Sequence, residues 1–194
     1  MPSGQFNQLN RLTPTCITTF AELINAKGYK TDDGERHWNI QVRMSPETGA
    51  QFIAEIEEIA LKLQEVERER LLLKKKRMRP GAPFIAFKNN NDGDYIINFK
   101  KKERMGNPPP VIDYNRTPID RKIPVGTRVQ VAYNLSPYTL VGTGMFGVSF
   151  QLIAVRVMEQ DLPSEEIQAV FCASKDNAIL KNEPQENINL DDLF

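Results

Sequence analysis

Apolar and polar residues alternate along two segments of this chain. In residues 38–44 every second side chain is apolar, starting with Trp38, and asparagine, glutamine or arginine stands between them. Residues 127–135 show a similar pattern with Val129, Val131 and Tyr133. Successive side chains of a strand point to opposite faces, so each segment predicts a strand with one buried face. β-Branched and aromatic residues predict further strands at residues 14–24, 84–87, 95–102, 110–114 and 148–158.

A helical period begins directly after the first alternating segment. Ser45-Pro46-Glu47 supplies an N-cap serine, a proline at the first helical position and an acid in the first turn. Apolar side chains then recur at three- and four-residue spacing, at Phe52, Ile56, Ile59, Leu63 and Val66. We predict one long helix over about residues 46–76, with a charged second half in solvent.

Turn residues separate these elements. Pro80-Gly81-Ala82-Pro83 ends the helix, and Asp92-Gly93 is typical of a tight hairpin turn. Residues 142–147 match the G-x-G-x-x-G spacing of a dinucleotide-binding loop, but a strand pattern follows where that loop requires a helix. We interpret these glycines as a β-turn or bulge. The whole pattern predicts an α+β fold dominated by β-structure, a small closed barrel with one inserted helix.

The composition is that of an ordinary globular protein, with 40% hydrophobic and 26% charged residues. No apolar run reaches the roughly 18 residues of a membrane span, and the first residues show no export signal. Cys16 and Cys172 have no metal-type spacing, so we expect reduced thiols in a cytoplasm-like compartment. The single histidine, His37, argues against a His-rich metal site and His-centred catalysis, and we expect no cofactor.

The net charge of zero conceals a segregation. Residues 161–194 carry eight acidic and two basic side chains, a net −6, which leaves +6 on residues 1–160. A basic body attracts a polyanion, and an acidic tail repels or competes with it.

Two basic clusters are candidates for phosphate contact. The first, at the predicted helix end, comprises Lys74, Lys75, Lys76, Arg77 and Arg79. These five positive charges are more than are required to stabilise the negative end of the helix dipole. The second comprises Lys100, Lys102 and Arg104, of which strand alternation places both lysines on one face. Two interpretations of this second cluster remain open. The lysines either form a charged sheet face that follows a nucleic-acid backbone, or they protect an exposed edge strand from aggregation. Arg128 adds charge further along the chain.

Aromatic rings are the second component of such a surface, because bases stack on them. Trp38, Phe99 and Tyr133 are in phase with apolar neighbours, so we assign them to the core. Tyr138 follows Ser136-Pro137, and we predict that it lies in a loop and stacks on a base.

Two other functions remain open at this stage. Asp92, Asp94, Asp113 and Asp120 are candidate Mg²⁺ ligands for a nuclease, although the first two are also ordinary turn residues. Alternatively, the long helix forms a coiled coil in a protein-interaction module.

The C-terminal segment combines acids with apolar residues. Asp191 and Asp192 supply charge, and Leu193 and Phe194 supply an apolar anchor. This combination suits a short motif that docks into a basic-rimmed apolar pocket of a partner. From residue 181 the apolar content is too low for independent folding, so we expect disorder.

Several blocks, in this order and spacing, resemble the single-stranded DNA-binding proteins of tailed phages, of the podovirus replication type. The blocks are Trp38-Asn39-Ile40-Gln41-Val42, the long helix with its basic end, Asp92-Gly93 before Ile97-Asn98-Phe99-Lys100, Val111-Ile112-Asp113 with Pro118-Ile119, and residues 126–138 and 147–157. The resemblance covers roughly residues 38–160 and the tail.

This resemblance implies an OB fold, a five-stranded Greek-key barrel, with a long inserted helix and a disordered acidic tail. It implies non-enzymatic, sequence-independent binding of single-stranded DNA during replication and recombination, in the cytoplasm of the infected bacterium. It assigns DNA contact to Lys100, stacking to Tyr138, and an arginine contact to either Arg77 or Arg79. It also implies tail-mediated recruitment of the replication polymerase and helicase-primase, and a homodimer. We therefore expect an arm at residues 1–12, the OB domain at 13–173 and the acidic tail at 174–194.

Overall fold

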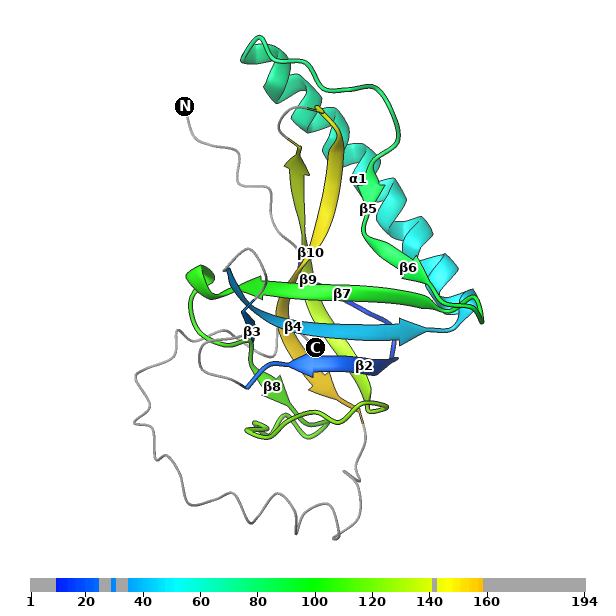
Figure 1. The fold of residues 1–194 in the computed structure, drawn as a ribbon, viewed down its shortest axis with the longest axis vertical. Helices are drawn as coiled ribbons and strands as arrows, with labels where there is room; N and C mark the ends of the chain where they lie inside the picture. Colours follow the sequence, from blue (N-terminus) through cyan, green and yellow to red (C-terminus); the bar gives the residue numbers. More distant parts are fainter. Residues whose placement is uncertain (1–9, 25–28, 31–34, 141–142, 159–194) are drawn as a thin grey trace, which may run out of the picture.

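One sheet and one long helix make up the fold in the computed structural model, which describes residues 10–24, 29–30, 35–140 and 143–158 (Figure 1). The strands are β1 (Arg11–Leu12), β2 (Cys16–Glu22), β3 (Tyr29–Lys30), β4 (Arg36–Met44), β5 (Phe84–Ile85), β6 (Phe87–Asn89), β7 (Tyr95–Lys102), β8 (Val111–Ile112), β9 (Arg128–Thr139) and β10 (Phe146–Val157). Helix α1 spans Pro46–Leu73, and a short 3-10 turn, η1, spans Glu103–Met105.

Five strands are long, with seven to twelve residues each: β2, β4, β7, β9 and β10. Their pairing runs from β9 to β2, β4, β7 and β10, and β10 pairs with β9 again. All of these pairings are antiparallel except that of β7 with β10. The circuit of hydrogen-bonded neighbours therefore returns to its first strand, and the five short strands pair at its margins.

The core lies between the inward faces of these long strands and the first half of the helix. Four rings, those of Phe52, Phe99, Tyr133 and Phe150, form five pairs with centroids 5.2–6.0 Å apart; Phe52 and Phe99 each pair with Tyr133 and Phe150, which also pair with each other. Trp38 is 1% exposed, Phe99 0% and Tyr133 3%, so the core assignment of these three residues is confirmed.

Helix α1 begins as predicted and ends slightly earlier. The Oγ of Ser45 accepts a hydrogen bond from the backbone N–H of Thr48, at 3.3 Å, and Pro46 is the first helical residue. At the other end, Lys75 has φ +56, and the backbone N–H groups of Lys75 and Lys76 donate to Leu72 and Leu71. This pattern is a Schellman motif, which stops the helix at Leu73 and not near residue 76.

Most predicted elements are present, and a sheet-dominated fold with one helix is confirmed. Arg11 and Leu12 pair with β9, so for these two residues the predicted N-terminal arm is wrong. Tyr138 belongs to strand β9, opposite Gly147, so its predicted loop position is wrong too.

The acidic tail lies outside the described residues. Among those that are described, no helix combines the length and apolar character of a membrane span.

Candidate functional site

A groove of about 620 Å³ crosses the outer face of the sheet. Four cationic side chains line it: Lys88, Lys100, Lys102 and Arg104. Phe84 and Phe87 also line it, with 50% and 36% of their surface exposed. Six polar side chains also line it, namely His37, Gln41, Asn98, Ser136, Ser149 and Gln151, and the remaining lining residues are apolar: Ala86, Ile96, Met105 and Phe150. The groove thus combines positive charge, flat rings and hydrogen-bonding groups.

Strand register explains why these side chains share one face. Gln41 of β4 lies opposite Asn98 of β7, and Lys100 pairs with Gln151 of β10. Ser149 of β10 lies opposite Ser136 of β9. The residues between them in each strand, such as Ile40, Phe99 and Val148, are fully buried in the core. The alternation that buries one face therefore exposes these polar positions on the other.

A second aromatic site lies further along β10. Gly147 is opposite Tyr138 of β9 and is also paired with Phe84 of β5. A Cβ atom at Gly147 would lie 2.6 Å from the Tyr138 ring and 3.0 Å from the Phe84 carbonyl oxygen. The tyrosine ring therefore lies directly over the glycine backbone. Partial burial raises the pKa of Tyr138, so its ring stays neutral at physiological pH.

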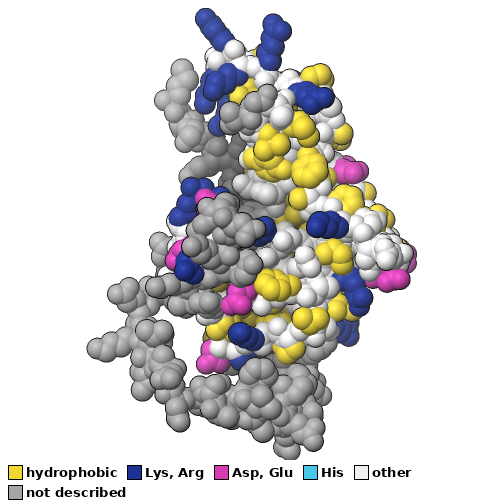
Figure 2. Space-filling model, in the orientation of Figure 1, with side chains coloured by type: hydrophobic (Ala, Val, Ile, Leu, Met, Phe, Trp, Pro, Cys, Tyr) yellow, Lys and Arg dark blue, Asp and Glu magenta, His cyan; other side chains and the backbone are white. Residues whose placement is uncertain are grey.

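The first basic cluster, at the end of α1, contacts the turn that leads into β10. The backbone N–H of Arg79 donates to the carbonyl oxygen of Gly144, at 2.9 Å, in the turn that precedes β10. Lys and Arg side chains stand at the end of the molecule where α1 ends (Figure 2). The turn and β10 therefore connect the basic cluster, the Tyr138–Phe84 site and the groove.

The cations of the groove differ in their pairing. Lys102 Nζ lies 2.6 Å from Glu35 Oε2, and the same oxygen lies 3.5 Å from His37 Nε2. Lys88, Lys100 and Arg104 form no ion pair with any residue that the structure describes. Among the described residues, Lys100 thus has no carboxylate partner, whereas Lys102 is paired with Glu35.

Arg128 does not join this surface. It begins β9, where it pairs with Ile17 of β2, and it does not line the groove. Tyr138 is near the other end of the same strand, about 33 Å away at roughly 3.3 Å per residue.

Phe84 and Phe87 are the ring residues that sequence reasoning missed. They stand in two short strands, β5 and β6, where no periodicity distinguishes exposed from buried positions. Their position just after the first basic cluster was the one available signal.

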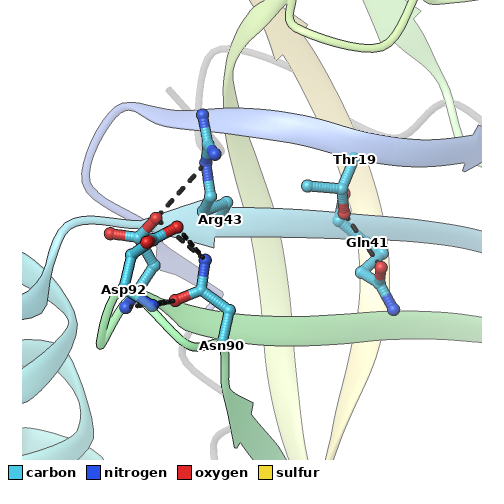
Figure 3. A network of polar contacts seen from close by, with 6 residues as sticks. Thr19, Gln41, Arg43, Asn90 and Asp92 are labelled. Carbon is cyan, nitrogen blue, oxygen red and sulfur yellow. Dashed lines mark hydrogen bonds and ion pairs between the residues drawn. The ribbon is translucent and has the colours of Figure 1, made fainter.

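Three of the four aspartates considered as metal ligands, Asp92, Asp94 and Asp113, take part in turns. Asn90 Oδ1 accepts hydrogen bonds from the backbone N–H groups of Asp92 and Asp94, and Asp94 also lies 3.6 Å from Arg43 (Figure 3). Asp113 Oδ1 accepts from the backbone N–H of Thr117, at 2.8 Å. Within the described ranges, no three His, Cys, Asp or Glu side chains gather as metal ligands.

The sheet, the single helix and the outward groove define a fold class that is also found among single-stranded DNA-binding proteins of bacteriophages. The structure of gp2.5, a single-stranded DNA-binding protein encoded by bacteriophage T7, matches with a TM-score of 0.62 and 16% identity, over 79% of this chain and 93% of that one. The single-stranded DNA-binding protein from bacteriophage Enc34, in complex with single-stranded DNA, matches with a TM-score of 0.55 and 15% identity, over 81% and 90%. No family model and no curated protein sequence matches this chain. At these identities, the similarity shows a shared fold.

Proposed function

We propose that this protein binds single-stranded DNA, without cleaving it, along the groove and the line of β10. The observation that carries the proposal is the continuity of this surface. It runs from Arg79 at Gly144, past Tyr138 and Phe84 at Gly147, to Lys100 at Gln151. The shared fold with phage proteins that bind single-stranded DNA supports the same function.

The chemistry of the groove suits sequence-independent binding. Lys88, Lys100 and Arg104 neutralise phosphates and release counterions. Phe84, Phe87 and Tyr138 offer flat surfaces to bases, and stacking tolerates any base. The rings of a duplex are already stacked and paired, so this surface favours an unpaired strand.

The five long strands form, in this proposal, an OB-type Greek-key barrel within a domain of residues 13–173. The closed circuit of their pairings supports that architecture. OB barrels bind oligonucleotides on an outward strand face, which is where the groove lies.

We also assign the protein a role in phage DNA replication and recombination, in the cytoplasm of the infected bacterium. In this view the protein forms a homodimer, and residues 174–194 recruit the replication polymerase and helicase-primase. Asp191, Asp192, Leu193 and Phe194 make the contact. The joint presence of charged and apolar groups in this motif supports the assignment.

A salt-titrated binding measurement tests the central proposal. We expect labelled oligo-dT to bind more tightly than a duplex of the same length, with affinity falling as salt rises. Lys100→Ala should weaken binding by about threefold to tenfold at 0.1 M salt and reduce the slope of log K against log salt by about 0.7. Lys62→Ala, on the exposed face of α1, is the matched control and should change neither. Equal effects of both variants, or equal affinity for duplex, would refute the proposed surface.

A further inference from the structure

The floor of the groove presents hydrogen-bond donors. Gln41 of β4 and Asn98 of β7 lie directly opposite each other, and both line the groove. Side chains in such a pair have Cβ atoms about 5 Å apart, within reach of the same base. An amide has one donor end and one acceptor end, so its orientation decides what it offers a ligand.

The orientation of Gln41 is fixed by Thr19. Strand β2 has a bulge between Thr18 and Phe20, so Thr19 has no partner in the register. Its hydroxyl lies 2.9 Å from Gln41 Oε1, the nearer acceptor, and 3.2 Å from the backbone carbonyl oxygen of Gln41 (Figure 3). The Gln41 amide oxygen is thereby held toward β2, and the Nε2 group points away from Thr19.

Asn98 also lines the groove, and its Oδ1 is buried and accepts no hydrogen bond from the described residues. Lys100, two residues along β7, adds a further donor. An ammonium group has no acceptor, and Gln41 turns its acceptor toward Thr19.

We propose that this donor-rich floor makes the protein prefer bases with a carbonyl oxygen at position 4 or 6, namely thymine, uracil and guanine, over cytosine and adenine, which carry an amino group there. This inference rests on the proposed function. Thymine and uracil present O4 as an acceptor where cytosine presents an N4 amino donor. A donor against a donor leaves both unpaired, which costs more than an ordinary hydrogen bond contributes. The preference is added to sequence-independent binding by charge and stacking.

Oligo-dU and oligo-dC of equal length give the sharpest test, because both are pyrimidines without the thymine methyl group. We expect the wild-type protein to bind oligo-dU about threefold or more tightly at one salt concentration. Gln41→Glu keeps an oxygen for Thr19 and replaces the groove-facing donor by an acceptor, so the dU:dC ratio should fall to one or below. Gln51→Glu, the same change at an exposed position of α1, should leave the ratio unchanged.

A second variant separates amide orientation from added charge. Thr19→Val removes the hydroxyl without changing the net charge, and it should lower the dU:dC ratio toward one while the salt slope stays as in the wild type. Equal wild-type affinities for oligo-dU and oligo-dC, with normal salt dependence, would overturn the base preference and leave DNA binding intact. Failure to bind either oligonucleotide would overturn both proposals.

Discussion

At the scale of single residues, a cation in the groove is not necessarily available to DNA. Lys102 and Lys100 project from the same face of β7, yet among the residues that the structure describes only Lys102 pairs with a carboxylate, that of Glu35. Both partners of that pair are partly exposed, at 39% and 42%, so solvent screens their attraction. In the proposed DNA complex, Glu35 would therefore be a weak internal competitor of a phosphate for Lys102.

Removal of this competitor should tighten binding. In Glu35→Gln, Lys102 is free to pair with a phosphate, so we expect stronger binding of oligo-dT and a salt slope steeper by about 0.7. Fluorescence anisotropy over a series of salt concentrations measures both quantities. Glu58→Gln, an exposed residue of α1 with the same charge change, should have a much smaller effect. If the two variants behave alike, the gain comes from net charge and not from Lys102.

At the scale of elements, the end of α1 shows a conformational cost that the sequence does not reveal. Lys75 adopts φ +56, a left-handed conformation that costs a residue with a Cβ about 1–2 kcal/mol. Glycine usually occupies this position of a Schellman motif. A lysine there agrees with selection for charge in the basic cluster.

Replacement of Lys75 by glycine should stabilise the protein. We expect Lys75→Gly to raise the free energy of unfolding by about 1 kcal/mol, because glycine adopts positive φ without strain. Urea unfolding followed by circular dichroism measures the change. Lys74→Gly is the control, since Lys74 has φ −90 and loses the same charge without relief of strain. A stability gain in both variants would show that charge repulsion within the cluster, and not backbone strain, is responsible.

Elements with a clear period were predictable, and those that depend on long-range pairing were not. The alternation in residues 38–44 predicts β4, and Ser45-Pro46 predicts the start of α1. Strand β9 continues through Pro137, where proline usually ends a strand. Among the described strands only β10 pairs with that part of β9, and a strand with an open edge tolerates a missing N–H.

The residues of the candidate site likewise fall into those that a local pattern predicts and those that long-range strand pairing brings together. Alternation places Lys100 and Lys102 on one face, and the register confirms that they share it. No local pattern reports that Phe84 lies beside Gly147, because a parallel pairing of distant segments brings them together. For the same reason, the sequence does not reveal that Arg128 and Tyr138 lie near opposite ends of one strand.

At the scale of the whole molecule, the chain separates its charges. Residues 161–194 carry −6, and residues 1–160 carry +6. Opposite charges on one chain meet at high effective concentration, so we expect the tail to compete with a polyanionic ligand for the basic surface. This competition is electrostatic, and its strength depends on the Debye length, about 10 Å at 0.1 M salt and about 3 Å at 1 M.

Deletion of residues 187–194 should therefore tighten binding of single-stranded DNA at low salt, and the gain should disappear as salt rises. Anisotropy titrations of the full chain and the truncated chain at several salt concentrations measure it. Replacement of Asp191 and Asp192 by asparagine should reproduce part of the gain without a change in length, whereas Phe194→Ala should not. Unchanged affinity at low salt after truncation would remove the tail as a competitor, and the acidic segment would then act on partners alone.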